Sequence, residues 1–180
     1  MFKKMNKLLI FDLDGTLLLD ESKRMDPRTV NSIQRAMAQG MHVVIASGRD
    51  KNGCKFVYEP LGLENGNHFL ALVNGQIIYD FEKKGYDLDD VLTTEDGIKI
   101  QKVCKEFGVE GIFQCGYDFY SYISSLNRVK KKVKNAIFGE LDDYGLKDGK
   151  ENRNFIDLPF EEIRLTQDIN KVIMVHSPRF

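Results

Sequence analysis

The stretch Leu8-Leu9-Ile10-Phe11-Asp12-Leu13-Asp14-Gly15-Thr16-Leu17 decides the fold of this chain. Its first four residues are apolar, which predicts a strand buried on both faces of a sheet. Asp12, Asp14 and Gly15 follow, which indicates that the strand ends in a tight turn. Because open α/β sheets bind ligands at the carboxyl ends of their strands, we expect the chemistry of the protein at this turn.

Two carboxylates so close together repel each other, and a hard cation such as Mg²⁺ relieves the repulsion through oxygen ligands. A lone Asp-x-Asp after an apolar run also occurs in ordinary turns and helix caps, and this stretch alone leaves that alternative open. A calcium loop of the EF-hand kind is excluded, because Gly15 stands too close to Asp12 to be the glycine of such a loop. The sequence contains no Walker-type phosphate loop.

The composition is that of an ordinary globular protein, with 180 residues, 42% of them hydrophobic and 29% charged. This length allows one domain, or one domain and the beginning of a second. A net charge of −1 gives no electrostatic reason to bind nucleic acid or an anionic membrane, and we expect neither as a partner. The three cysteines, Cys54, Cys104 and Cys115, form no C-x-x-C pair, which predicts free thiols and a cytoplasmic protein.

Helix and strand patterns alternate after the first turn. Asp26-Pro27 predicts the start of a helix over residues 27–39. Apolar runs predict strands over 42–46 and 68–73, and a helix over 51–61 separates them. This β–α–β order predicts neighbouring parallel strands and therefore an α/β protein with a Rossmann-like parallel sheet.

Polar residues follow each of the three strands. Asp12 and Asp14 follow the first, Ser47 the second and Asn74 the third. Because parallel strands end at the same edge of a sheet, these side chains should converge there. Asn74-Gly75 also predicts a turn into a return strand over residues 76–79.

The pattern changes after residue 80, and we predict one domain over residues 1–80 and a second, smaller α/β domain over 81–180. Polar residues 82–90 predict a linker. The second domain is expected to contain a helix capped near Thr94, with Ile98, Val103, Cys104 and Phe107 on its apolar face, and a second helix over 126–138. Strands are expected over 111–115, 118–123 and 171–176. An irregular segment is expected over 139–157, with pairing of Phe155-Ile156 left open as an alternative, followed by the start of a short helix at 158–163.

Three motifs together resemble a known family. Phe11–Leu17 resembles the first motif of the haloacid dehalogenase superfamily, and Ala46-Ser47-Gly48-Arg49 resembles the second. Val73-Asn74-Gly75 resembles the turn of the Cof-type branch, whose α/β cap is inserted after the third core strand. The resemblance implies a Rossmann-like core, present in part over residues 1–80, with an inserted α/β cap over 81–180.

The resemblance implies a Mg²⁺-dependent phosphohydrolase that acts on small phosphorylated metabolites. Asp12 would be the nucleophile that forms an aspartyl-phosphate, and Asp14 would be the general acid and then the general base. Both would bind Mg²⁺, Asp12 through its carboxylate and Asp14 through its main-chain carbonyl. Phosphoryl transfer to an acceptor other than water, as in a mutase, would use the same intermediate.

Four residues are implied to bind the substrate. Ser47 and the amide of Gly48, near a helix N-terminus, would hold phosphoryl oxygens. Arg49 and Asn74 are further candidates. For Arg49 the alternative is that it only braces its loop, and for Asn74 that it only shapes a turn.

The sequence also departs from the family pattern. In the family, a lysine and a Gly-Asp-x-x-x-Asp motif that follow the cap complete the site. After Asn74 this sequence contains no such motif, and none of its lysines, including Lys171, can be assigned to that position. We therefore expect the chain to end within the cap, so that the first strand presents an open apolar edge through which the protein could self-associate. The alternative function is a catalytically impaired module that binds phosphate or a partner without turnover.

Overall fold

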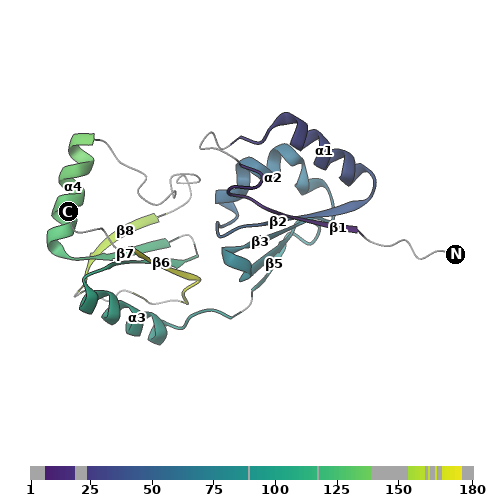
Figure 1. Cartoon of the computed structure of the whole chain (residues 1–180). Coiled ribbons are helices and arrows are strands. Elements are labelled where there is room, and N and C mark those ends of the chain that lie inside the picture. The colour runs from purple at the N-terminus through teal and green to yellow at the C-terminus, as the bar shows by residue number, and fades with distance from the viewer. Residues whose placement is uncertain are drawn as a thin grey trace. The chain divides into compact units, whose positions relative to one another are not determined.

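The computed structural model describes residues 7–18, 24–88, 90–116, 118–138, 154–160, 162, 165 and 168–175. They belong to two compact units that divide between Asp90 and Val91 (Figure 1). The first unit contains strands β1 (Lys7–Asp12), β2 (Met41–Ala46), β3 (Phe69–Leu72), β4 (Ile77–Asp80) and β5 (Gly85–Leu88), and helices α1 (Pro27–Ala38) and α2 (Lys55–Leu61).

The five strands of the first unit form one sheet in the order β1-β2-β3-β4-β5. β1, β2 and β3 are parallel, as predicted, whereas β4 and β5 are antiparallel to their neighbours. Asp12 lies opposite Ala46, which in turn lies opposite Ala71, so the three parallel strands end at the same edge. The predicted α/β class with a parallel core is confirmed.

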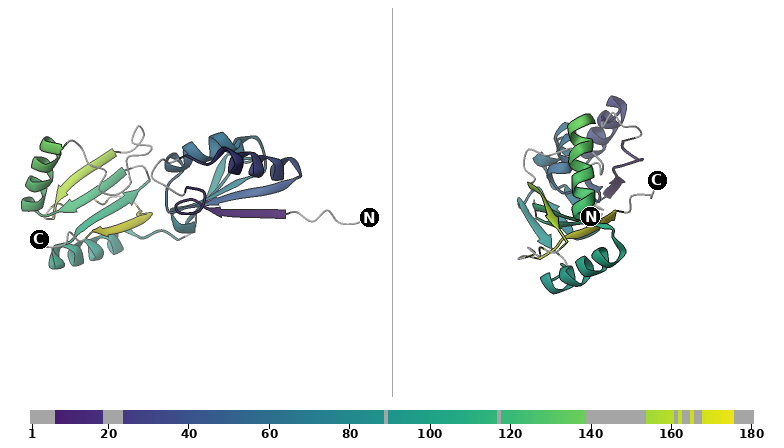
Figure 2. Two further views of the ribbon diagram at one scale, coloured as in Figure 1. Left: turned by 45° about the horizontal axis from the view of Figure 1, so that its top comes forward. Right: turned by 90° about the vertical axis from the view of Figure 1, so that its left-hand side faces the viewer.

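Helices α1 and α2 lie on one side of this sheet (Figures 1 and 2). Helix α1 begins and ends close to the predicted residues, since Asp26 caps it by accepting a hydrogen bond from Arg28 N–H. Helix α2 ends at Leu61 as predicted, where Gly62 adopts the left-handed region, but it begins at Lys55 rather than at residue 51, after a 3₁₀ turn over Asn52–Cys54. The core of the unit lies between the helices and the sheet. Its buried residues include Ile33 of α1, Val57 and Leu61 of α2, Val43 and Ile45 of β2, and Leu70 of β3.

The prediction that β1 is buried on both faces is wrong. β1 is the edge strand of the sheet, and the side chains of Leu8 and Ile10 are 53% and 63% exposed. Leu9 and Phe11, which alternate with them, pack against the core. The predicted open apolar edge is therefore present among the described residues. Self-association through this edge stays a prediction.

The linker predicted over residues 82–90 is wrong for 85–88, which form β5. This strand pairs antiparallel with β4, with Tyr86 opposite Tyr79. β5 is an edge strand with a mostly exposed surface, so its polar composition does not prevent pairing. The first unit consequently continues to Asp90 rather than ending at residue 80.

The second unit contains a sheet in the order β8-β7-β6-β9. β6 is antiparallel to β7 and β9, and β7 is parallel to β8. The predicted strands and the two predicted helices are confirmed. The elements are α3 (Thr94–Phe107), β6 (Glu110–Cys115), β7 (Asp118–Ile123), α4 (Ser125–Phe138), β8 (Asn154–Pro159) and β9 (Lys171–Val175).

Three predictions for the second unit are wrong. Val103 and Phe107 are exposed, whereas Cys104 is buried as predicted. Helix α3 also buries Gly97 and Gln101, and only a glycine at position 97 lets α3 approach Ile169 so closely. The short helix predicted to begin at residue 158 is replaced by the end of β8. The irregular segment predicted over 139–157 is wrong for residues 154–157, which belong to β8, where Phe155 pairs with Phe119 and Ile156 with Tyr120. Residues 139–153 lie outside the described part of the chain.

The predicted free thiols are confirmed, since Cys54, Cys104 and Cys115 are all unpaired and buried. Within the described ranges, no helix has both the length and the apolar character needed to cross a membrane.

A buried histidine joins the starts of β2 and β3, and it gives a prediction about pH. His68 Nδ1 accepts a hydrogen bond of 3.1 Å from the Val43 N–H, which requires a neutral ring. Burial lowers the pKa of His68, and the neighbouring His42 lowers it further. The contribution of His68 to the free energy of unfolding should be fully present above about pH 6.5. It should decrease as the pH drops further, since the unfolded chain binds the proton at a higher pH than the folded protein does.

His68→Asn keeps an acceptor for Val43 but does not titrate. We expect it to lose stability less steeply than the wild type between about pH 6.5 and pH 5, by at most about 1.4 kcal/mol per pH unit. Urea unfolding at several pH values measures the two slopes. Equal slopes would contradict this role for His68.

Candidate active site

The first loop of the candidate site follows β1. Gly15, at a φ of +80°, turns the chain, and its N–H donates to the Leu18 carbonyl while the Leu18 N–H donates to the Leu13 carbonyl. The side chains of Leu13 and Leu18 are buried and anchor the turn. Asp12 and Asp14 are left exposed at the edge of the sheet.

The second loop follows β2, and Ser47 holds it in place through one hydrogen bond to β3 and one within the loop. The Ser47 N–H donates a 2.8 Å hydrogen bond to the Ala71 carbonyl of β3. The Ser47 hydroxyl accepts a 3.2 Å hydrogen bond from the Arg49 N–H. Ser47 is buried, so its hydroxyl is fixed in place just below the surface of this edge.

The third loop follows β3 and is bound to the second by two main-chain hydrogen bonds. The Val73 N–H donates to the Arg49 carbonyl at 3.1 Å, and the Asn74 N–H donates to the Ser47 carbonyl at 3.2 Å. Val73 and Asn74 have φ values of +51° and +61°, which is unusual for a β-branched valine. Backbone strain of this kind often accompanies functional sites, because the surrounding structure must hold it in place.

An ion pair connects the first loop with the second. Arg49 Nε and a terminal guanidinium nitrogen donate to the two carboxylate oxygens of Asp14 at 3.1 and 2.8 Å. The guanidinium also lies 5.7 Å from the centre of the Phe56 ring. The three loops therefore bring together five of the predicted residues through direct bonds or strand pairing: Asp12, Asp14, Ser47, Arg49 and Asn74.

Gly48 lies between Ser47 and Arg49, but the helix expected to begin beside it begins further on. Residues Asn52–Cys54 form a 3₁₀ turn, and α2 follows from Lys55. The buried Asp50 carboxylate accepts the Gly53 N–H at 2.7 Å and so caps this turn. The partial positive charge of a helix start is therefore not directed at Gly48.

Two polar groups near the loops were not singled out from the sequence. Thr16 Oγ1 donates a long hydrogen bond of 3.4 Å to Asp12. Cys54 lies buried against Ser47 and Arg49, and burial raises the pKa of its thiol to about 12 in spite of both neighbours. Cys54 is therefore a neutral thiol at pH 7 and not a nucleophile. One signal in the sequence could have placed Cys54 here. The three-residue spacing between Asp50 and Gly53 is typical of a capped turn, and Cys54 is the last residue of that turn.

The donors at this edge fit Mg²⁺, which prefers oxygen ligands and often binds through one or two carboxylates together with water and substrate phosphate. The Asp12 carboxylate is exposed, and the hydrogen bonds inside its loop leave out the Asp14 carbonyl oxygen. Within the part of the chain that the structure describes, no three His, Cys, Asp or Glu side chains converge as a metal site would require. Among the described residues, the candidate ligands are thus the Asp12 carboxylate and the Asp14 carbonyl oxygen.

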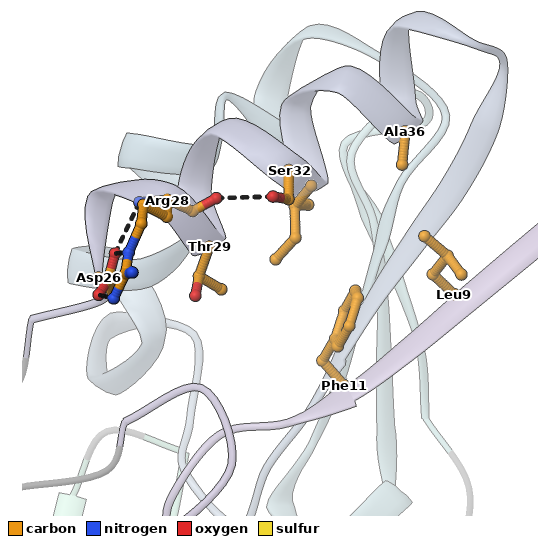
Figure 3. A pocket seen from close by; sticks show the side chains of 8 residues that line it. Leu9, Phe11, Asp26, Arg28, Thr29, Ser32 and Ala36 are labelled. Atoms are coloured by element: carbon orange, nitrogen blue, oxygen red, sulfur yellow. Dashed lines mark hydrogen bonds and ion pairs between the residues drawn. The ribbon is translucent and has the colours of Figure 1, made fainter.

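A hollow of about 510 Å³ lies between β1 and α1, and none of the predicted site residues lines it (Figure 3). Leu9 and Phe11 line it from the strand, and Ser32 lines it from the helix. Its charged residues, Asp26 and Arg28, already bind each other at 2.8 Å. The Ser32 hydroxyl likewise donates to the Arg28 carbonyl at 2.7 Å. Because these polar groups of the lining bind one another, the hollow is a weaker candidate than the sheet edge.

Parallel strands that end in an acidic loop, a serine loop and an asparagine turn define an α/β protein of the Rossmann-like class, with a candidate site at the carboxyl edge of these strands. Residues 9–177 match the family model of haloacid dehalogenase-like hydrolases. The chain belongs to this family, and its Cof-type motifs place it in that branch.

Curated relatives carry phosphatase names. A Streptococcus pyogenes protein with a provisional phosphatase name is 33% identical over 124 residues, which are 64% of this chain and 45% of that protein. The 5-amino-6-(5-phospho-D-ribitylamino)uracil phosphatase of Bacillus subtilis is 39% identical over 74 residues, 41% of this chain and 28% of that protein. The pyridoxal phosphate phosphatase of Escherichia coli is 24% identical over 59% of this chain and 38% of that protein.

Solved structures share the fold. A haloacid dehalogenase-like hydrolase from Bacteroides thetaiotaomicron has a TM-score of 0.69 and 21% identity, over 96% of this chain and 59% of that one. A HAD/COF-like hydrolase from Plasmodium vivax has a TM-score of 0.67 and 25% identity, over 96% and 57%. The chain thus spans less than two thirds of the length of the proteins it matches.

Proposed function

We propose that the chain carries the site of a Mg²⁺-dependent phosphatase that acts on small phosphorylated metabolites. The observation that carries this proposal is the joining of the three loops at one sheet edge, through the Asp14–Arg49 ion pair and the Asn74–Ser47 hydrogen bond. Membership of a hydrolase family supports the reaction class. The substrate class is supported by two relatives whose names specify small phosphorylated metabolites.

In the proposed reaction, an Asp12 carboxylate oxygen attacks phosphorus while the bond to the leaving oxygen breaks. The carboxylic acid form of Asp14 gives its proton to that oxygen. Water then attacks phosphorus and passes a proton back to Asp14. This step releases inorganic phosphate and restores the Asp12 carboxylate.

The remaining residues would bind the phosphoryl group. Ser47, whose hydroxyl accepts from Arg49 N–H, still has a proton to donate to a phosphoryl oxygen. Arg49 offers a planar guanidinium that matches phosphate oxygens, and the main-chain N–H of Gly48 and the side-chain amide of Asn74 lie in the same loops. Mg²⁺, when bound by Asp12 and the Asp14 carbonyl, supplies positive charge that offsets the repulsion between carboxylate and phosphate.

Removing the metal tests this proposal. We expect the chain to hydrolyse p-nitrophenyl phosphate in the presence of Mg²⁺, and a chelator to reduce the rate by about a hundredfold or more, because the repulsion between Asp12 and the phosphate is then unrelieved. Release of p-nitrophenolate measures the rate. Hydrolysis that continues unchanged in the chelator would contradict a magnesium phosphatase.

One observation favours a second function. In the ranges that the structure describes, the site offers no third acidic ligand. A chain that binds phosphate or a partner without turnover would fit such a site. Phosphate binding by a folded wild-type chain that does not hydrolyse p-nitrophenyl phosphate would favour this function over the phosphatase.

A further inference from the structure

The Asp14–Arg49 pair engages two groups that the proposed function needs elsewhere. Both oxygens of Asp14 accept hydrogen bonds from Arg49, at 3.1 and 2.8 Å. A carboxylate in this arrangement only accepts, so Asp14 must leave Arg49 before it can carry and donate a proton. Arg49, for its part, turns two of its donors toward Asp14 rather than toward a phosphoryl group.

The two partners differ in how much they depend on the pair. The Arg49 side chain is only 19% exposed, whereas that of Asp14 is 58% exposed. A largely buried guanidinium needs an anion beside it, because removing its partner leaves an uncompensated charge. An exposed carboxylate that loses its partner is solvated by water at little cost.

The main chain of Arg49 is fixed where a phosphoryl group would bind. Its N–H donates to the Ser47 hydroxyl and its carbonyl accepts from Val73 N–H. The guanidinium at the end of the side chain reaches across to the first loop, beside the Phe56 ring. A phosphate that reached Ser47 would therefore meet Arg49 with no movement of the backbone.

We propose that a phosphate dianion bound at this edge replaces Asp14 as the anionic partner of Arg49, and that this exchange releases the Asp14 carboxylate from its ion pair. The inference rests on the proposed function. A dianion with three terminal oxygens is a stronger partner for the guanidinium fork than a single carboxylate. Arg49 keeps an anion beside it throughout, and Asp14 becomes available only when substrate is bound.

The exchange predicts that Asp14 and phosphate compete for Arg49. Asp14→Asn should bind inorganic phosphate more tightly than the wild type, measured by titration calorimetry with Mg²⁺ on the whole chain. Loss of one negative charge near the phosphate contributes to this gain in any case, and the same substitution in an Arg49→Gln background measures that contribution alone. We expect Asp14→Asn to increase the phosphate affinity about fivefold more when Arg49 is present than in the Arg49→Gln background, in keeping with a partly exposed ion pair.

Asp26→Asn is the matched control. Asp26 forms the same two-bonded pair with Arg28, at 3.2 and 2.8 Å, outside the candidate site. The asparagine retains the helix cap. Phosphate affinity should change by less than about twofold in this variant.

Equal gains in the two backgrounds would overturn the exchange while leaving the phosphate site in place. A wild-type chain and an Asp14→Asn chain that both fail to bind phosphate would refute the phosphate site itself, and the exchange with it. A larger gain when Arg49 is present, with Asp26→Asn unchanged, supports the exchange.

Discussion

Replacing Asp12 with asparagine is expected to reduce Mg²⁺-dependent hydrolysis of p-nitrophenyl phosphate by about a thousandfold or more. An amide oxygen carries no negative charge and cannot form the aspartyl-phosphate, so the substitution removes the proposed nucleophile. Asparagine has nearly the shape of aspartate, and Asp12 is exposed at the end of β1. The fold should therefore be unaffected, and release of p-nitrophenolate measures the loss directly.

The control for this prediction is again Asp26→Asn, which removes one carboxylate from the same unit at the start of α1. It should hydrolyse the ester at the wild-type rate. Turnover by Asp12→Asn that equals that of the control would refute Asp12 as the nucleophile. A decrease confined to Asp12→Asn, with an unchanged circular dichroism spectrum, supports the assignment.

The convergence of the three loops at one sheet edge could be predicted, because it depends on local sequence and on one general rule. An apolar run followed by polar residues locates the end of each strand, and parallel strands end at a common edge. Asp12, Ser47 and Asn74 were placed in this way, and the hydrogen bond from Asn74 to Ser47 agrees with it. The Asp14–Arg49 pair could not be predicted, because its geometry depends on how two separate loops are oriented.

Errors in the predicted fold arose where tertiary packing overrides local pattern. The apolar spacing of α3 favoured Val103 and Phe107 as its buried face, yet Phe107 is 70% exposed. The helix instead turns Gly97 toward Ile169, and only the absence of a side chain allows that approach. Likewise, Pro159 favoured a helix start but ends β8, an edge strand, where the missing N–H of proline is tolerated.

Truncating Ile45 to alanine should lower the free energy of unfolding by about 3 kcal/mol, whereas truncating Ile10 should lower it by less than about 1 kcal/mol. Ile45 on β2 is 0% exposed and Ile10 on the neighbouring β1 is 63% exposed. Because the same substitution is made on adjacent strands, the comparison separates the cost of creating a buried cavity from the cost of removing an exposed side chain. Urea unfolding followed by circular dichroism, at a low protein concentration, measures both.

The comparison also tests the open edge of β1. An Ile10→Ala loss as large as that of Ile45→Ala at every concentration would contradict the exposed outer face of the strand. A loss that appears only as the protein concentration rises would instead indicate that a second copy covers this face. Self-association is expected on physical grounds, because an unpaired edge strand with exposed Leu8 and Ile10 offers both main-chain hydrogen bonds and apolar area.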